Sequence, residues 1–287
     1  MARVRKLAIH ARRLARENFS GDYHSSFRGQ GLDFDEFREY QPGDEPRFID
    51  WNVSARMQKT YVRKFKEERE LTVILAIDIS GSTDFGSDHF SKRERAAELT
   101  ALLGFSARYN GDKVGLLLFA GEPILYIPPH KGGKSILRAV REVLATESPD
   151  NGTSLRNASE FLTRTLKKKG LIFFISDFID QDWEKSFAAL AARNEVIALS
   201  LTDPVERALP DVGKVLLRDP ESGEEVLVNT SNANVRMGYE KIARRYRENL
   251  RSFFNQHTID HLEVSSDSED YLPRLHALFK QRAKSKR

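Results

Sequence analysis

The sequence predicts a doubly wound α/β fold with a mostly parallel sheet, preceded by a small N-terminal α+β subdomain. Short apolar runs without polar alternation predict strands buried on both faces, at residues 71–77, 114–119, 171–176 and 196–201. Helical stretches separate these runs, at about 91–109, 133–145, 154–168 and 182–193. Alternating strands and helices are typical of a parallel sheet that carries helices on both faces.

The later part of the chain adds a hairpin and then continues the same scheme. Residues 215–217 and 225–228 flank a turn at 219–223. A long helix at about 235–255 carries one apolar stripe, and a strand near 258–264 and a helix near 270–282 come after it. The earlier helix at 91–109 is apolar nearly all round, which predicts that it is buried.

The N-terminal part has a different pattern. Between residues 4 and 15, apolar side chains have the spacing of one helix face, which predicts a helix docked on the protein's own body. Residues 20–56 are rich in aromatics, glycine and acids, and residues 60–70 are typical of a strand with a charged exit. We expect a small core of Phe34, Phe37, Tyr40, Phe48 and Trp51. The predicted domains are residues 1–69 and 70–287.

Composition indicates a globular protein, because 40% of the 287 residues are hydrophobic and 31% are charged. No apolar run approaches the roughly 20 residues that span a bilayer, and the basic N-terminus lacks the apolar core of a signal peptide. Cysteine is absent, which excludes disulfides, thiolate nucleophiles and Cys-ligated zinc. We therefore expect a cytoplasmic protein without an integral membrane segment.

The net charge of +4 is unevenly distributed. Residues 1–16 hold six Arg and Lys, residues 280–287 hold five, and neither stretch contains an acid. The 35 bases and 42 acids between them give the body a net charge of −7. Nucleic-acid-binding domains carry their basic residues on a folded face, so we expect no nucleic-acid partner. Binding of DNA or RNA by the two basic ends stays open as an alternative.

Oxygen-bearing side chains come after two of the predicted strands. Asp78, with Ser80 and Ser82, comes directly after the strand at 71–77, and Asp177 comes directly after the strand at 171–176. Thr153 stands at the start of the helix that precedes the second of these strands. In open α/β sheets, ligands bind beyond the carboxyl ends of the strands, so both carboxylates are expected at one edge of the sheet.

Two carboxylates and three hydroxyls, without His or Cys, make a set of hard oxygen donors. Such donors suit Mg²⁺, or alternatively Mn²⁺ or Ca²⁺, and argue against zinc and copper. Mg²⁺ takes six oxygens and keeps several waters, so a site with few direct protein ligands leaves a position for an outside oxygen. A carboxylate from a partner protein suits that position.

In this order and on these elements, Asp78-x-Ser80-x-Ser82, Thr153 and Asp177 resemble the metal-ion-dependent adhesion site of von Willebrand factor type A domains, a Rossmann-like fold, over about residues 70–282. The resemblance implies that the two serines, and often the threonine, bind the metal directly. It implies that the aspartates act largely through water and hydrogen bonds, and that an acidic side chain of a partner completes the site. The plainer alternative is a cluster of helix caps.

A second resemblance lies upstream. Residues 31–44 (GLDFDEFREYQPGD) lead into Arg47-Phe48-Ile49-Asp50-Trp51 and Ala55-Arg56, and this resembles the signature of the bacterial domain-of-unknown-function family 58. In that family the signature precedes a von Willebrand type A-like domain, and members are usually paired with MoxR-type AAA+ ATPases. The resemblance implies a non-enzymatic adaptor or co-chaperone that links such an ATPase to a client protein.

Read physically, the signature has a structural explanation. Pro42-Gly43 predicts a turn, and Asp44 is placed to cap the next segment. Arg47 and Asp50 are three residues apart, which lets them pair on one helical turn. Phe48 and Trp51 are expected to bury against the sheet. The functional interpretation is that Arg38, Arg47 or Arg56 faces the ATPase or the metal.

The competing function is an Mg²⁺-dependent phosphohydrolase with Asp78 as nucleophile. That chemistry normally needs a second carboxylate two residues on, where this chain has Ser80, and a lysine near a later strand end. No lysine directly follows the strands at 171–176 or 196–201. We therefore expect a binding module without catalytic residues.

Overall fold

The computed structural model describes residues 2–19, 23, 26–27, 31–68, 70–87, 90–147, 152–218, 223–268 and 270–285. The chain forms two compact units. The sheet unit comprises Met1–Ser26 and Leu71–Arg287, and the small unit comprises Phe27–Glu70. The sequence placed the N-terminal helix in one domain with the signature, whereas in the structure that helix packs with the sheet unit.

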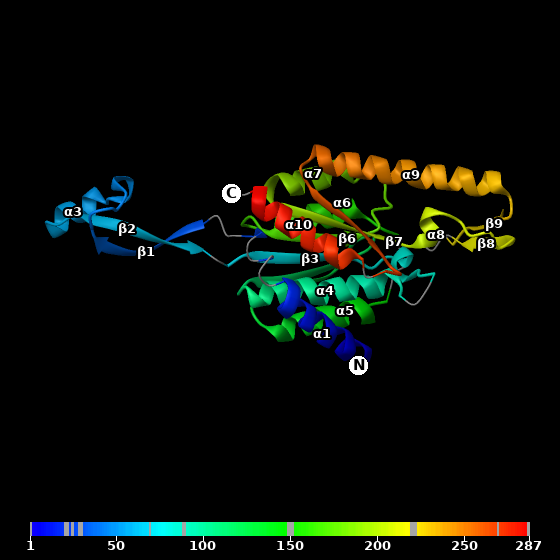
Figure 1. The fold of residues 1–287 in the computed structure, drawn as a ribbon, viewed down its shortest axis with the longest axis horizontal. Helices are drawn as coiled ribbons and strands as arrows, with labels where there is room; N and C mark the ends of the chain where they lie inside the picture. Colours follow the sequence, from blue (N-terminus) through cyan, green and yellow to red (C-terminus); the bar gives the residue numbers. More distant parts are fainter. Residues whose placement is uncertain are drawn as a thin grey trace. The chain divides into compact units, whose positions relative to one another are not determined.

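The sheet unit is built on a sheet whose strand order is β10-β7-β6-β3-β4-β5 among the described residues (Figure 1). Neighbouring strands are parallel except for β4 and β5, which are antiparallel. The strands are β3 (Thr72–Asp78), β4 (Lys113–Phe119), β5 (Pro123–His130), β6 (Leu171–Ser176), β7 (Glu195–Thr202) and β10 (Asp260–Ser265). This six-stranded, mostly parallel sheet with helices around it confirms the mixed α/β class and is compatible with a doubly wound fold.

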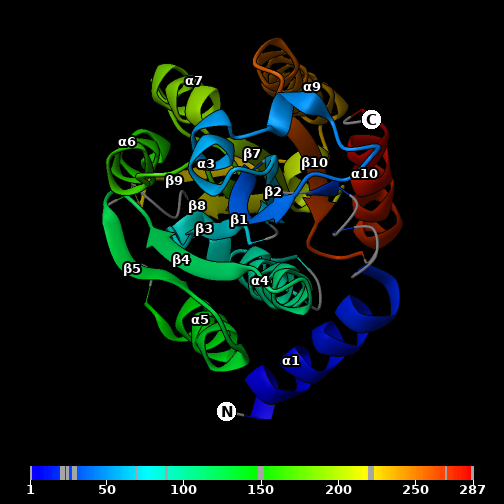
Figure 2. The same ribbon diagram turned by 90° about the vertical axis from the view of Figure 1, so that its left-hand side faces the viewer.

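Helices cover both faces of the sheet, with α6, α7 and α9 on one side and α4 and α5 on the other (Figure 2). Helix α4 begins with a capping box of Ser91 and Glu94 and is buried along most of its length, as the sequence predicted. The helices of this unit include α4 (Lys92–Tyr109), α5 (Gly133–Ala145), α6 (Leu155–Thr165), α7 (Glu184–Arg193), α8 (Pro204–Arg207), α9 (Ala233–Gln256) and α10 (Tyr271–Ser285).

The N-terminal helix α1 (Ala2–Leu14) packs against α4, and a π-helical turn (Ala15–Phe19) comes after it. Ala8, Ala11 and Ala15 are buried. Their small side chains let the two helix backbones approach closely, which confirms that this helix docks on the body of the protein.

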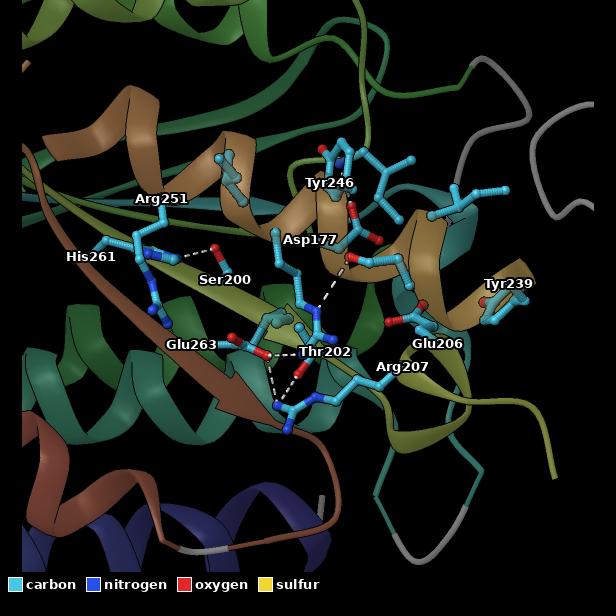
Figure 3. Close-up of a pocket in the computed structure, with 16 residues that line it drawn as sticks. Asp177, Ser200, Thr202, Glu206, Arg207, Tyr239, Tyr246, Arg251, His261 and Glu263 are labelled. Atoms are coloured by element: carbon cyan, nitrogen blue, oxygen red, sulfur yellow. Dashed lines mark hydrogen bonds and ion pairs between the residues drawn. The ribbon is translucent and has the colours of Figure 1, made fainter. Parts of the chain in front are cut away.

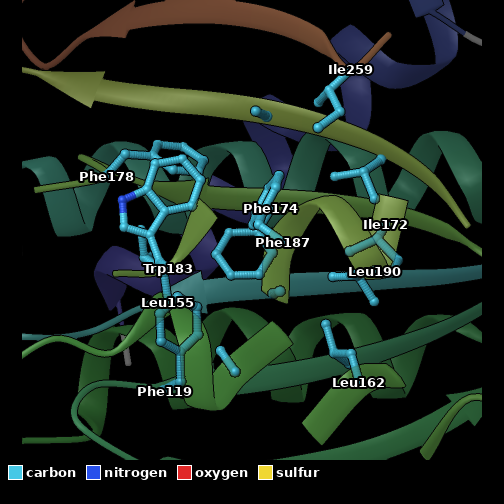
Figure 4. Packing of buried hydrophobic residues seen from close by; sticks show 14 of the residues in the cluster. Phe119, Leu155, Leu162, Ile172, Phe174, Phe178, Trp183, Phe187, Leu190 and Ile259 are labelled. Atoms are coloured by element: carbon cyan, nitrogen blue, oxygen red, sulfur yellow. The ribbon is translucent and has the colours of Figure 1, made fainter. Parts of the chain in front are cut away.

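A cluster of aromatic rings forms the core beneath α7 and α9 (Figure 4). The Phe174 and Phe187 ring centroids lie 4.9 Å apart, and those of Phe178 and Phe254 lie 5.2 Å apart, both at steep interplanar angles. Phe178 has a positive φ of 61°, an uncommon conformation for a non-glycine residue. Its buried ring, and a hydrogen bond from the Tyr246 hydroxyl to its carbonyl, hold the chain just after Asp177 in this conformation.

Two peripheral features of the sheet unit differ in how well the sequence predicted them. The hairpin of β8 (Lys214–Arg218) and β9 (Glu225–Asn229) is confirmed, although four residues of its predicted turn, 219–222, lie outside the described residues.

Strand β5 was not predicted. It contains three prolines and an irregular burial pattern, which an edge strand tolerates because one side needs no hydrogen-bond partner.

In the small unit, β1 (Gly31–Glu39) pairs with β2 (Tyr61–Glu68) in antiparallel fashion, with an irregularity between Phe34 and Glu36. A 3₁₀ turn (Pro46–Phe48) and α3 (Trp51–Met57) connect the two strands. The predicted aromatic core is wrong for three of its members, since Trp51 is 70% exposed and Phe37 and Tyr40 are also exposed. A two-stranded ribbon offers no second layer within the unit against which these rings could bury.

Polar contacts in the small unit also differ from the expectation. Arg47 pairs with Glu45 and not with Asp50. Asp50 is the N-cap of α3 and pairs with Arg63 at 2.7 Å, because its carboxylate must face the first turn of that helix to accept its N–H groups. Asp44 does not cap the segment after it; its carboxylate accepts the Gln41 N–H at 2.8 Å and so closes the turn that precedes it.

Candidate metal centre

The two predicted carboxylates lie at the carboxyl ends of adjacent strands. β3 and β6 are parallel neighbours, with Ile77 opposite Ile175, so Asp78, one residue on, and Asp177, two residues on, lie at the same edge of the sheet. We call this edge, formed by the carboxyl ends of the parallel strands, the carboxyl edge. Both aspartates are buried. Two neighbouring buried acids are costly unless hydrogen bonds or cations compensate them.

Asp78 is held by hydrogen bonds on both oxygens. Its Oδ1 accepts the Ser80 N–H at 2.9 Å, and its Oδ2 accepts the Ser176 hydroxyl at 2.6 Å. Burial raises the pKa of Asp78 to about 7, and the charge of Asp177 adds to this, although the hydrogen bonds from Ser176 and Ser80 oppose the rise. A cation beside Asp78 would offset both the burial and the repulsion.

The hydroxyls of Ser80 and Ser82 are hydrogen-bonded to each other, with their Oγ atoms 3.2 Å apart. Adjacent ligands of an octahedral ion with bonds of about 2.1 Å are separated by about 3.0 Å. Ser80 is the N-cap residue of the 3₁₀ turn Gly81–Asp84, yet among the described residues its side chain makes no capping hydrogen bond there. Capping therefore does not account for these two hydroxyls.

Thr153 lies in the loop that begins α6. The next residue, Ser154, is the N-cap of that helix and accepts the Asn157 N–H at 3.2 Å. The backbone N–H of Ser154 also donates to the Ala120 carbonyl, at 2.8 Å, just beyond the end of β4. The loop is therefore tied to the carboxyl edge, and Thr153 is not the helix cap that the plainer alternative requires.

The second carboxylate already has a positively charged partner, Lys92, which the sequence analysis missed. The Lys92 Nζ lies 2.7 Å from Asp177 Oδ2 and 2.6 Å from Glu206 Oε1, and the lysine is fully buried. Burial alone would lower the pKa of Lys92, but Asp177 and Glu206 raise it overall, so the amine is an ammonium. Asp177 is thus engaged by Lys92, which suits an indirect role toward a metal better than a direct bond.

One signal in the sequence could have identified Lys92. It opens a helix that was predicted to be buried nearly all round, and a buried lysine is rarely found without an acidic partner. The same reasoning applies to Arg93, which is buried and fixes the loop after β3. Its guanidinium donates to the Ile79 carbonyl at 2.6 Å and pairs with Asp84 at 3.0 Å.

The donor set fits a hard cation by its chemistry. Within the described part of the chain, no group of three or more His, Cys, Asp or Glu side chains is placed to hold a metal ion. The predicted set is of another kind, since it combines two carboxylates with three hydroxyls from three loops. Binding of a metal by Asp78, Ser80, Ser82, Thr153 and Asp177 stays a prediction.

The predicted partner-binding arginines all lie in the small unit. Arg38 pairs with Asp44 at 2.7 Å, Arg47 pairs with Glu45, and Arg56 is exposed near the end of α3. Their role toward a partner also stays a prediction. Asp203, at the end of β7, is buried and has a structural role, because its carboxylate caps α8 and accepts hydrogen bonds from Ser87 and Ser266.

Fold and edge together define a mixed α/β protein whose carboxyl edge gathers buried acids, hydroxyls and a buried ammonium. The chain belongs to the family described as "Protein of unknown function DUF58", which it matches over residues 36–249. This confirms the family expected from the signature.

Among curated relatives, the chain is 35% identical over 206 residues to "Uncharacterized protein Rv1480" of Mycobacterium tuberculosis (strain ATCC 25618 / H37Rv). The match covers 71% of this chain and 65% of the relative, so the chain spans slightly less than two thirds of that protein's length. It is 29% identical over 106 residues to "Uncharacterized protein YeaD" of Bacillus subtilis (strain 168), covering 37% of this chain and 24% of that protein.

Among solved structures, the chain is similar to the conserved hypothetical protein BatB from Bacteroides thetaiotaomicron, with 20% identity, a TM-score of 0.49, and coverage of 75% of this chain and 99% of that one. An aerotolerance-related membrane protein from Bacteroides fragilis NCTC 9343 matches with 17% identity, the same TM-score and the same coverage. A membrane spanning protein from Vibrio fischeri matches with 14% identity and a TM-score of 0.27, over 74% of this chain and 98% of that one.

These names contradict the cytoplasmic location expected from the sequence. Two of the similar structures are named as membrane proteins, and we therefore withdraw the assignment to the cytoplasm. Across the residues that the structure describes, none of the helices combines the length and the apolar character needed to cross a membrane.

Proposed function

We propose that this chain is a metal-ion-dependent protein-binding module. In this proposal Ser80, Ser82 and Thr153 hold Mg²⁺, or Mn²⁺ or Ca²⁺, at the carboxyl edge, and an acidic side chain of a partner takes the remaining position. The observation that carries the proposal is the pair of serine hydroxyls 3.2 Å apart beside the buried Asp78. Their spacing is close to that of adjacent ligands of Mg²⁺.

The arrangement around the serines supports the roles assigned to the two aspartates. Asp78 has both oxygens in hydrogen bonds, one of them to the Ser80 backbone, so it orients the loop that carries the hydroxyls. Asp177 pairs with the Lys92 ammonium. In this proposal Asp177 therefore acts on a metal beside Asp78 indirectly and does not bind it.

The class of partner comes from the resemblance of the signature. Members of this family that are paired with MoxR-type AAA+ ATPases suggest that the module acts as an adaptor or co-chaperone between such an ATPase and a client. The exposed Arg47 and Arg56 of the small unit are the candidate contacts to the ATPase.

The competing function, a phosphohydrolase with Asp78 as nucleophile, gains one feature and lacks another. Lys92 supplies the buried lysine that the sequence argument did not find. However, Asp78 is fully buried and both its oxygens accept hydrogen bonds, which is a poor arrangement for a nucleophile that must reach a phosphorus atom. Steady turnover of p-nitrophenyl phosphate that is lost in Asp78→Asn would favour the enzyme.

Calorimetric titration of Mg²⁺ and Mn²⁺ tests the metal site. We expect binding by the wild-type chain and its loss in the double variant Ser80→Ala, Ser82→Ala. Ser135→Ala is the control, because it removes a serine hydroxyl at the start of α5 that the proposal does not use. Unchanged binding in the double variant, or equal losses in the variant and the control, would contradict the proposal.

Capture of a purified MoxR-type ATPase on the immobilised chain tests the adaptor role. We expect capture by the wild-type chain and weaker capture by the pair Arg47→Ala, Arg56→Ala. If the ATPase docks through the small unit, this loss occurs with and without Mg²⁺, whereas client binding requires the metal. Equal capture of the ATPase by the wild-type chain and the arginine variant, with and without Mg²⁺, would contradict the adaptor proposal. It would leave the metal-site proposal unaffected.

A further inference from the structure

A pocket of about 250 Å³ lies between α9, the carboxyl-terminal half of β7, and His261 and Glu263 of β10 (Figure 3). Residues of α8 and of the loop after β6 complete its lining, and we call it the α9 pocket. Asp177 and Glu206 line it, but the serines and Thr153 of the candidate metal centre do not. It is therefore a separate cavity that shares only the Asp177–Lys92–Glu206 ion pairs with that centre.

The sheet face beneath the pocket changes character along the strands. Toward the amino-terminal ends of the strands this face belongs to the apolar core, with Val196, Ala198 and Ile259 packed among aromatic rings. Further along the strands the face carries polar side chains, namely Ser200 and Thr202 of β7 and His261 and Glu263 of β10. A face with only a structural role would stay apolar, because burying polar groups costs free energy.

Three arginines line the pocket, namely Arg207, Arg247 and Arg251. Among the described residues, the only acid that lines it besides Asp177 and Glu206, which already share Lys92, is Glu263. The Glu263 Oε1 lies 2.8 Å from the Arg207 guanidinium and 3.7 Å from that of Arg247. Three guanidinium groups thus face a single available carboxylate.

One further group favours an anion. The Arg207 Nε is buried and has no hydrogen-bond partner among the described residues, and the same holds for the Glu263 Oε1, which lies against the Arg207 guanidinium. Burial, together with Arg251 and Arg274, lowers the pKa of His261 to about 4, so the imidazole is neutral, and its Nε2 lies 2.7 Å from the Ser200 hydroxyl. The charged donors that a negative group would meet in the pocket are therefore guanidinium groups and not the histidine.

The remaining walls are apolar. Tyr239, Ile242, Tyr246 and Leu250 come from successive turns of α9, and Ile179 also lines the pocket. At about 30 Å³ for each water, the cavity has the volume of roughly eight waters, which suits a ligand about as large as one amino-acid side chain with its carboxylate. Ligand pockets typically combine such apolar walls with a few convergent polar groups.

We propose that the α9 pocket binds a small organic anion with an apolar body, namely an aromatic or aliphatic carboxylate. The carboxylate pairs with Arg247 and Arg207, and the apolar body packs on the aromatic face of α9. Two sources offer this chemistry, a free small acid and the C-terminal residue of a peptide.

Titration of the full-length chain with 3-phenylpropionate, followed by NMR, tests this proposal against the neutral isostere 3-phenylpropanamide. We expect the acid to bind about tenfold tighter than the amide, since a charge-assisted pair is lost in the amide. Arg247→Gln should weaken binding of the acid about tenfold, and Ala243→Trp, which fills the cavity without removing charge, should abolish binding of both probes. Arg245→Gln is the matched control, because it removes the same charge from the same helix outside the pocket.

A second arm uses acetyl-Gly-Phe with a free carboxylate and distinguishes the two sources. Tighter binding of the dipeptide than of 3-phenylpropionate assigns the pocket to a peptide C-terminus, and the reverse assigns it to a free acid. Equal affinity for acid and amide, no binding of either, or binding that survives both Arg247→Gln and Ala243→Trp overturns the proposal. Urea unfolding of each variant establishes that it is folded.

Discussion

The sheet unit and the small unit differ in how deeply they bury the charged side chains of their ion pairs. In the sheet unit, Lys92 is fully buried between Asp177 and Glu206, and Asp78 is fully buried between two hydrogen bonds. In the small unit, the pairs Lys59–Glu39 and Lys64–Glu36 have side chains that are at least half exposed. Exposed pairs contribute little to stability, whereas buried ones are costly to break.

This difference bears on where the chemistry resides. The small unit carries the part of the sequence that is easiest to recognise, yet several of its ion pairs are solvated and its aromatic Trp51 is exposed. The carboxyl edge has a sparse sequence signal, but there the fold keeps charges in low dielectric, where a cation or anion interacts strongly. The proposals accordingly assign ligand chemistry to the sheet unit and surface recognition to the small unit.

The largest expected effect separates the aromatic residues of the two units. Phe174→Ala should lower the free energy of unfolding by about 3–5 kcal/mol, because it opens a cavity in the ring cluster. Trp51→Ala should change it by no more than about 0.5 kcal/mol, because that ring is exposed. Urea unfolding measures both, and similar losses in the two variants would break the comparison.

The next effect concerns the buried ammonium. Lys92→Met should cost about 3–5 kcal/mol of stability, because it leaves Asp177 and Glu206 without their cation. If the metal site is as proposed, Mg²⁺ should restore part of this loss by neutralising the same edge. Lys59→Met, in an exposed pair of the small unit, should leave urea unfolding unchanged with or without Mg²⁺. A Lys92→Met variant with the same free energy of unfolding as the wild type would show that the ion pairs of Lys92 with Asp177 and Glu206 do not stabilise the fold.

A pH dependence of stability should come from His261, whose pKa is lowered to about 4 by burial and by Arg251 and Arg274. The unfolded chain binds the proton near pH 6.5 and the folded chain only near pH 4, so the contribution of His261 to stability falls as the pH is lowered through this window. This contribution should reach at most about 3 kcal/mol, and Asp78, whose pKa is raised to about 7, contributes in the opposite direction. Relative to the wild type, His261→Gln should therefore gain stability between pH 6.5 and 4, as measured by thermal unfolding, and an unchanged slope would contradict this cause.

The smallest effect should come from the exposed arginines of the small unit. Arg47→Ala removes one partner of a surface ion pair with Glu45 and should alter the free energy of unfolding by less than about 0.5 kcal/mol. Differential scanning calorimetry provides the measurement. A loss of several kcal/mol would mean that the signature pins the small unit together and is not a recognition surface.

The sequence predicted the parts of the fold that repeat a regular pattern. The bounds of β6, Leu171–Ser176, and of α5, Gly133–Ala145, agree with the prediction. Burial on both faces leaves an unbroken apolar run in a strand, and burial of one stripe leaves a helical periodicity. The positions of Asp78 and Asp177 at one edge came from the same reasoning.

The features that could not be predicted depend on contacts between distant segments. β5 has no simple periodicity, because it is an edge strand with prolines. Lys92 meets Asp177 only after α4 packs beside the sheet, and the Arg207 and Arg247 pairing with Glu263 joins three separate elements. The exposure of Trp51 was missed because aromatic composition does not reveal how many layers a unit has.

The most direct test of the central claim is a crystal of the full-length chain soaked in Mn²⁺, with anomalous diffraction recorded at the manganese edge. The proposed site predicts an anomalous peak within bonding distance of the Ser80 and Ser82 hydroxyls, with Asp177 still bound to Lys92. A chain whose manganese peaks all lie elsewhere, with the two serine hydroxyls bonded only to protein or water, would contradict it.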